Sequence, residues 1–157
     1  MAEVIPVPEN AWAAAYAVHA ESFPPEAADF LSPESFRSLA SGTRAVLLGV
    51  SARAGKEGLL GYILFRLAGD EAEILSLGVR PAARGQGVGK KLVSAAVAAA
   101  RARGAAKVFL ETSPANDAAA GVYRALGFAA CGIRKGYYRH KNGEIEDALT
   151  MVLPLVN

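Results

Sequence analysis

Three alternating glycines, which join an apolar run to a helical pattern, constrain this chain more than any other feature. The segment reads Val79-Arg80-Pro81-Ala82-Ala83-Arg84-Gly85-Gln86-Gly87-Val88-Gly89-Lys90-Lys91. Glycine has no Cβ, so such a turn can adopt positive φ and bring main-chain N–H groups close to an anion. The helix that follows adds unpaired N–H donors and the positive end of its dipole. The segment therefore predicts either a phosphate-binding loop or a plain strand-to-helix turn.

The spacing of these glycines excludes two familiar nucleotide-binding loops. A Walker A loop needs glycine where this chain has Arg84, and Ser or Thr where it has Lys91. A dinucleotide fingerprint needs its third glycine three residues after the second, whereas these glycines alternate. The pattern that remains is Arg84-x-x-Gly87-x-Gly89.

Length and composition predict one soluble domain over residues 1–157. Apolar residues make up 52% of the 157 and charged residues 20%, which suits a single packed core. The net charge of +2 is spread along the chain, which argues against nucleic-acid binding. A single cysteine, Cys131, excludes an internal disulfide, and we expect no metal site. With no secretory signal and no apolar run long enough to span a bilayer, we expect a cytoplasmic protein without membrane contact.

The order of elements predicts a mixed α/β fold. Strands are expected over residues 44–51, 59–67, 71–79, 107–112, 128–138 and 147–155. Helices are expected over 12–23, from Ser32-Pro33 onward, over 87–103, and from Ser113-Pro114 to Leu126-Gly127. The first three strands suggest an antiparallel meander, and the last two a hairpin around Lys141-Asn142-Gly143. These elements would form a central, mostly antiparallel twisted sheet flanked by helices.

Three side chains in the second half are candidates for chemistry. Glu111 ends a strand, where it is either a general base at the sheet edge or a solvated strand end. Tyr123 lies two helical turns after Asn116, and its phenol is either a proton donor or a core group. Asn116 itself is a candidate ligand-binding residue or a helix cap.

Several short motifs, in one order, resemble those of the GCN5-related N-acetyltransferase (GNAT) family, in its ribosomal-protein-alanine N-acetyltransferase (RimI-type) branch. They are Arg84-x-x-Gly87-x-Gly89, Leu110-Glu111, Asn116-x-x-Ala119-x-x-x-Tyr123, Leu126-Gly127-Phe128, Arg134-x-x-Tyr137-Tyr138 and Glu146-Asp147-Ala148-x-x-Met151. The resemblance implies the acyl-CoA N-acyltransferase fold, acetyl-CoA as co-substrate, and acetylation of a protein N-terminus, with ribosomal protein bS18 as the partner.

The resemblance also implies roles for particular residues. Glu111 would deprotonate the amine, and Tyr123 would protonate the leaving thiolate. Main-chain groups of Leu77 and Val79 would bracket the pantetheine arm and thioester. The cofactor-binding residues would further include Arg84, Gly85, Gln86, Gly87, Val88, Gly89 and Asn116.

The acceptor side is less defined by the sequence. Tyr137 and Tyr138 would form an aromatic wall around the acceptor or simply pack the hairpin. An acidic connection with Glu26, Asp29 and Glu34 would attract a basic terminus or be a solvated loop. A basic cluster, made of Arg134, Lys135, Arg139, His140 and Lys141, would face the nucleotide phosphate or solvent.

Two other functions stay open at this point: acetylation of a small amine or a lysine side chain, and a non-catalytic acyl-CoA-binding module. We expect a monomer or a weak dimer.

Overall fold

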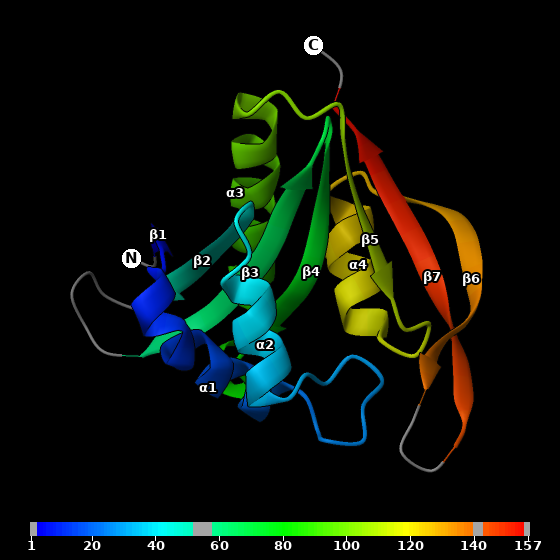
Figure 1. The fold of residues 1–157 in the computed structure, drawn as a ribbon, viewed down its shortest axis with the longest axis horizontal. Helices are drawn as coiled ribbons and strands as arrows, with labels where there is room; N and C mark the ends of the chain where they lie inside the picture. The colour runs from blue at the N-terminus through cyan, green and yellow to red at the C-terminus, as the bar shows by residue number, and fades with distance from the viewer. Residues whose placement is uncertain (1–2, 52–57, 140–142, 156–157) are drawn as a thin grey trace.

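The computed structural model describes residues 3–51, 58–139 and 143–155. Within these ranges one sheet has the strand order β1-β2-β3-β4-β5-β7-β6 (Figure 1). Its strands are β1 (Glu3–Pro6), β2 (Ala45–Ser51), β3 (Leu59–Ala68), β4 (Glu71–Val79), β5 (Lys107–Thr112), β6 (Ala129–Arg139) and β7 (Ile145–Pro154). Only β4 and β5 pair in parallel, and every other neighbouring pair is antiparallel. The predicted mixed α/β fold with a mostly antiparallel sheet is confirmed.

Four α-helices accompany the sheet in the described part of the chain. They are α1 (Trp12–Ser22), α2 (Pro33–Ala40), α3 (Val88–Ala102) and α4 (Asp117–Ala125), with 3-10 turns η1 (Glu9–Ala11) and η2 (Pro81–Ala83). The predicted cap of α2 is confirmed, because Ser32 Oγ accepts from Ser35 N at 3.1 Å and Pro33 is the first helical residue. No helix in the described ranges is both long and apolar enough to cross a membrane.

The structure differs from the expected elements in two places: one helix start was wrong, and one strand was missed. Helix α4 begins at Asp117 rather than Ser113, because Ser113 and Asn116 close a turn first, with Asn116 N donating to Ser113 O at 3.0 Å. Strand β1 was not predicted, since its four residues include Pro6 and carry no alternating pattern long enough to recognise. The β6–β7 hairpin is confirmed, although Lys141 and Asn142 of its predicted turn lie outside the described residues.

The two faces of the sheet bury separate hydrophobic clusters (Figure 1). The cluster under α1 and α2 includes Val18, Phe36, Tyr62 and Leu64. The larger cluster under α3 and α4 includes Ile63, Phe65, Leu92 and Tyr123. Successive residues of β3 enter opposite clusters, with Tyr62 and Leu64 in one and Ile63 and Phe65 in the other, as the two-residue period of a strand requires.

The two central strands, β4 and β5, are paired at one end of the sheet and separate at the other. β4 and β5 pair only from Glu71 to Ile74, opposite Lys107 to Leu110. The β3–β4 register then shifts by one residue after Ile74, where Leu75 forms a bulge. Beyond this point β4 and β5 diverge (Figure 1). The gap falls beside the C-terminal ends of both strands, where α/β proteins commonly bind ligands.

Candidate functional site

A cavity of about 770 Å³ lies between the α1–α2 connection, the end of β4, the glycine loop and α4. We call it the donor cleft. Eight of the nine residues predicted to bind a cofactor line it: Leu77, Val79, Arg84, Gly85, Gly87, Val88, Gly89 and Asn116. Gln86 does not, because its side-chain amide turns back to donate to Ala82 O at 3.4 Å.

The glycine loop has the backbone geometry of an anion cradle. Gly85 has φ of 77° and Gly87 has φ of 80°, in the left-handed region that other residues avoid. Gly87 is the N-cap of α3 and provides no side-chain cap, so the first N–H groups of the helix stay available to a ligand. Gly89 differs from the expectation: its φ is not positive, and a Cβ there would meet Val122 at an ordinary 3.5 Å.

The main chain of β4 offers further hydrogen-bonding groups to the donor cleft. Arg80 N donates to Leu60 O at 2.8 Å, which marks a hydrogen-bonded pair of the antiparallel β3–β4 ladder. Such pairs alternate, so Gly78 is bonded to β3, whereas Leu77 and Val79 direct their main-chain groups away from β3. Val79 O accordingly accepts from Ser22 Oγ at 3.0 Å, on the side of the cleft.

A second cavity of about 420 Å³ adjoins the donor cleft; we call it the acceptor pocket. It brings together Glu111, Tyr123, Tyr137 and Tyr138, the four residues predicted for catalysis and acceptor binding. The two cavities share part of their lining: Phe23, Ala28, Asp29, Leu77, Asn116 and Ala119. Residues from distant parts of the sequence therefore form one continuous site with two compartments.

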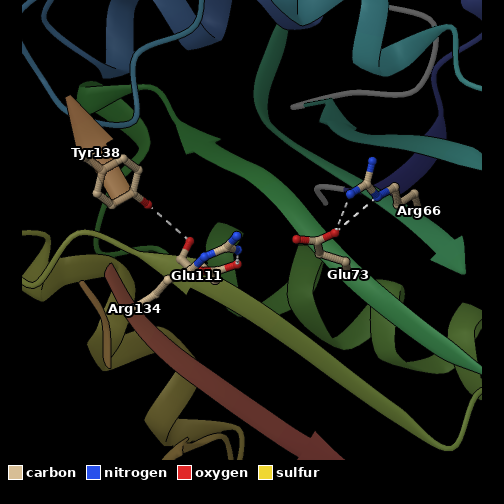
Figure 2. A network of polar contacts seen from close by, with 5 residues as sticks. All are labelled: Arg66, Glu73, Glu111, Arg134 and Tyr138. Carbon is tan, nitrogen blue, oxygen red and sulfur yellow. Dashed lines mark hydrogen bonds and ion pairs between the residues drawn. The ribbon is translucent and has the colours of Figure 1, made fainter. Parts of the chain in front are cut away.

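Glu111 is held in the acceptor pocket with one oxygen engaged. Its Oε1 accepts from Arg134 Nη1 at 2.8 Å, and its side chain is only 10% exposed (Figure 2). Its Oε2 is buried and has no hydrogen-bond partner within the described ranges. A buried acceptor without a donor is costly, so this oxygen is a candidate position for a hydrogen bond to a ligand or to solvent.

A second ion pair lies across the pocket from Glu111. Arg66 on β3 donates to Glu73 Oε1 on β4 through Nη2 at 2.7 Å and Nε at 3.1 Å (Figure 2). Both carboxylates of these pairs line the acceptor pocket, but only Glu111 has a buried orphan oxygen in the described part of the chain.

Tyr123 combines a buried ring with a hydroxyl to which no described residue hydrogen-bonds. The ring packs on Phe128 at 5.5 Å between centroids, and the residue is 4% exposed. Within the described chain, no side chain or main-chain group hydrogen-bonds its Oη. Burial, and then the charge of Asp29, raises the pKa of Tyr123 above its ordinary 10, so the phenol stays protonated at neutral pH.

Tyr137 and Tyr138 lie edge to face, with ring centroids 4.9 Å apart, and both line the acceptor pocket. Arg134 lies over the Tyr137 ring at 4.7 Å. Tyr138 donates a long hydrogen bond of 3.4 Å to the main-chain oxygen of Glu111 (Figure 2). Tyr138 therefore joins the β6–β7 hairpin to the end of β5 at the pocket wall, and Tyr137 packs beside it.

Asn116 is the N-cap of α4, which is one of the two roles predicted for it. Its Oδ1 accepts from Ala119 N at 3.3 Å, while its Nδ2 donates to Asp29 Oδ2 at 3.3 Å. Capping and lining of the cleft are compatible, because each uses a different atom of the amide.

Sequence reasoning missed the partners of these groups. Arg134 was assigned to a basic cluster facing phosphate or solvent, but it pairs with Glu111, and the donor cleft is lined by neither Arg134, Lys135 nor Arg139. The remaining two members, His140 and Lys141, lie outside the described residues. Only tertiary structure brings β6 over the end of β5, so no local pattern could reveal this pair.

A buried polar chain next to the pocket was also missed. Leu31 N donates to His19 Nε2 at 2.8 Å, which leaves the ring proton on Nδ1. His19 Nδ1 lies 2.6 Å from Tyr62 Oη, which lies 2.7 Å from Ser76 Oγ on the pocket wall. The chain of hydrogen bonds fixes the α1–α2 connection to the sheet beside the acceptor pocket.

Comparison with known proteins agrees with this arrangement. Residues 12–128 match the model of the Acetyltransferase (GNAT) family. A [ribosomal protein bS18]-alanine N-acetyltransferase of Haemophilus ducreyi is 34% identical over 100 residues, which are 64% of this chain and 69% of that protein. The protein of the same name from Escherichia coli K12 is 37% identical over 86 residues, which are 55% of this chain and 57% of that protein.

The fold as a whole is also similar to a solved structure. The crystal structure of the ribosomal-protein-S18-alanine N-acetyltransferase from Escherichia coli superimposes with a TM-score of 0.83 and 28% identity. The superposition covers 100% of this chain and 96% of the other. The region that matches the family model includes the glycine loop, Glu111 and Tyr123, and it covers most of the chain. This chain therefore belongs to the GNAT family of acetyltransferases.

Proposed function

We propose that this chain transfers the acetyl group of acetyl-CoA to the N-terminal α-amino group of a protein, with ribosomal protein bS18 as the acceptor. One observation carries the proposal: the donor cleft and the acceptor pocket share a wall, and Glu111 and Tyr123 lie on the acceptor side of it. A thioester and an amine bound in the two compartments would meet at this wall. We propose further that residues 1–157 form one cytoplasmic acetyltransferase domain that acts as a monomer or weak dimer.

The donor cleft suits an acyl-CoA molecule. Positive-φ glycines and the uncapped start of α3 provide N–H donors for a diphosphate. Arg84 and Lys90 border the same cleft and add positive charge. The outward main-chain groups of Leu77 and Val79 match the amide groups of an extended pantetheine arm, which would run along β4 toward the acceptor pocket.

The acceptor pocket suits a reaction by direct attack. The incoming ammonium group passes a proton to Glu111, and its nitrogen forms a bond to the acetyl carbon. The bond from that carbon to sulfur breaks, Tyr123 gives its proton to the leaving thiolate, and the second proton lost by the nitrogen returns to the Tyr123 oxygen. The protein holds both proton-transfer groups, Glu111 and Tyr123, in place. Binding the two reactants side by side supplies much of the acceleration.

Chemistry and relatives both favour an N-terminal acceptor. An α-amino group has a pKa of about 7.7 to 8.0, against about 10.4 for lysine, so a carboxylate produces the free α-amine far more readily near neutral pH. The two relatives compared above are named for acetylation of the alanine of bS18. Tyr137 and Tyr138 would contact the first residue of that acceptor.

A direct assay separates the proposal from its alternatives. Release of coenzyme A from acetyl-CoA is measured with a peptide of the bS18 N-terminus, the same peptide blocked at its N-terminus but carrying a free lysine, and a panel of small amines. We expect turnover with the first peptide and at least tenfold less with the others. Turnover only with lysine or small amines would overturn the acceptor, and binding of acetyl-CoA without any turnover would overturn the enzymatic role.

A further inference from the structure

Three carboxylates of the described residues line the acceptor pocket, and they are not equivalent. Glu73 is paired with Arg66 at 2.7 Å, and Glu111 with Arg134 at 2.8 Å. Asp29 is half-buried, yet across the described residues no arginine, lysine or histidine pairs with it. Its hydrogen bonds come from neutral groups: Asn116 Nδ2 donates at 3.3 Å, and the main-chain N–H of Asp29 itself donates to the carboxylate. A carboxylate removed from water in this way favours the approach of a cation.

Asp29 also occupies the place where the two compartments meet. Among the described residues, it is the one acidic residue that borders both the donor cleft and the acceptor pocket. Glu73 and Glu111 border only the pocket, and Glu146 borders only the cleft. A cation bound to Asp29 would therefore lie at the shared wall, next to the position proposed for the thioester.

The α1–α2 connection holds Asp29 in a defined position. Ala27 N donates to Pro24 O at 2.9 Å and Phe30 N to Ala27 O at 3.2 Å, which folds the connection into consecutive turns. Leu31 N then anchors its end to His19 Nε2 at 2.8 Å, and the Phe30 ring packs on the His19 ring. A carboxylate on such a segment can orient a ligand, because little freedom is lost on binding.

We propose that Asp29 binds the ammonium form of the acceptor's N-terminus at the wall between the two compartments and orients its nitrogen toward the thioester. Glu111 then receives the proton, so one carboxylate recognises the charge and the other removes it. This inference rests on the proposed function and names the group that recognises the acceptor. It also accounts for the lack of a cationic partner of Asp29 among the described residues.

The electrostatics of the site agree with this assignment. Burial raises the pKa of Asp29 above its ordinary value and the charge of Glu146 raises it further, while hydrogen bonds from its own main-chain N–H and from Asn116 lower it. Asp29 in turn contributes to raising the pKa of Tyr123 and of Tyr138. The shared wall is thus a region of negative potential, which a bound ammonium group would relieve.

The test uses Asp29→Asn, which removes the charge and keeps the shape. Two acceptors of the same sequence are compared at pH 7: the bS18 N-terminal peptide, and a version whose first residue is replaced by aminooxyacetyl. The aminooxy group is a nucleophile without charge at this pH. We expect KM for the ammonium peptide to rise about tenfold or more, with KM for the aminooxy peptide and the affinity for acetyl-CoA within twofold of wild type.

Two further variants separate recognition from structure. Glu34→Gln removes a negative charge from α2, outside both compartments. We expect it to leave KM for both acceptors unchanged. Asp29→Glu returns the charge and should recover part of the affinity for the ammonium peptide. Equal losses on both acceptors in Asp29→Asn, or no loss on either, would overturn the proposal. If wild-type enzyme uses only lysine or small amines, the proposed acceptor is wrong, and the role of Asp29 is then decided by comparing the amine that is used with its aminooxy counterpart, because those acceptors are also ammonium ions.

Discussion

At the scale of single residues, the acceptor pocket distinguishes between carboxylates that look alike in sequence. Glu73 and Glu111 both lie on strands, both pair with an arginine and both line the pocket. They differ in one atom, because Oε2 of Glu111 is buried and lacks a partner in the described chain. We therefore propose that this oxygen takes the proton from a bound amine, and that Glu73 serves only its ion pair with Arg66.

This difference leads to a paired prediction. Glu111→Gln should lower kcat/KM for the bS18 peptide about 100-fold, as loss of a general base does, and leave acetyl-CoA affinity unchanged. The loss should shrink above pH 9, where the α-amine is already deprotonated. Glu73→Gln should change kcat/KM less than fivefold at any pH. Pre-steady-state and steady-state rates from pH 6 to pH 9.5 check this, and a loss in Glu111→Gln that is independent of pH would contradict the role of base.

At the scale of elements, the donor cleft depends on how α3 begins. Positive-φ glycines flank this helix at both ends: Gly87 at its N-cap with φ of 80°, and Gly104 after its C-terminus with φ of 82°. A Cβ at either position would meet no atom within 4 Å. Substitution by alanine therefore adds similar backbone strain at both ends, but only Gly87 borders the donor cleft.

We predict that the two alanine variants separate stability from binding. Gly87→Ala and Gly104→Ala should each cost about 1 kcal/mol of unfolding free energy. Gly87→Ala alone should weaken coenzyme A binding tenfold or more, because the loop N–H groups must shift to relieve the strain. Urea titration and calorimetry with coenzyme A measure the two effects. Equal affinities in both variants would argue that the N-terminus of α3 does not bind the diphosphate.

At the scale of the whole molecule, His19 links parts of the chain that are distant in sequence. His19 lies on α1 and is fully buried. Its ring contacts Leu31 N of the α1–α2 connection and Tyr62 Oη of β3. Burial lowers the pKa of His19 from the ordinary 6.5 to about 4. The donor from Leu31 also requires an unprotonated Nε2, so the folded protein is built around a neutral imidazole.

The low pKa of His19 predicts a loss of stability in mild acid. Below pH 6.5 the unfolded chain binds a proton that the folded protein excludes, so stability is complete above pH 6.5 and is lost as the pH falls toward 4. Between pH 7 and pH 5 this group should remove about 2 kcal/mol of unfolding free energy. His19→Gln should be less stable at pH 7 but lack this component of the decline. Urea unfolding at both pH values tests the prediction, and parallel declines in the two proteins would contradict it.

The sequence by itself determined what depends on neighbours along the chain. Glycine spacing predicted the loop before α3, Ser32-Pro33 predicted the start of α2, and strand patterns predicted six of the strands, because capping, turns and alternation are local effects. The family resemblance added candidate site residues, and eight of the nine cofactor candidates lie on one cleft.

Only the tertiary structure decided which polar and charged groups meet. The pairing of Arg134 with Glu111, the contact of Asn116 with Asp29 and the anchor from Leu31 to His19 join residues from separate elements, so no local pattern encodes them. Burial adds a second reason. Whether Asp29 is a solvated loop residue or a half-buried carboxylate depends on the divergence of β4 and β5 and on the segment packed beside it, and these are properties of the assembled sheet.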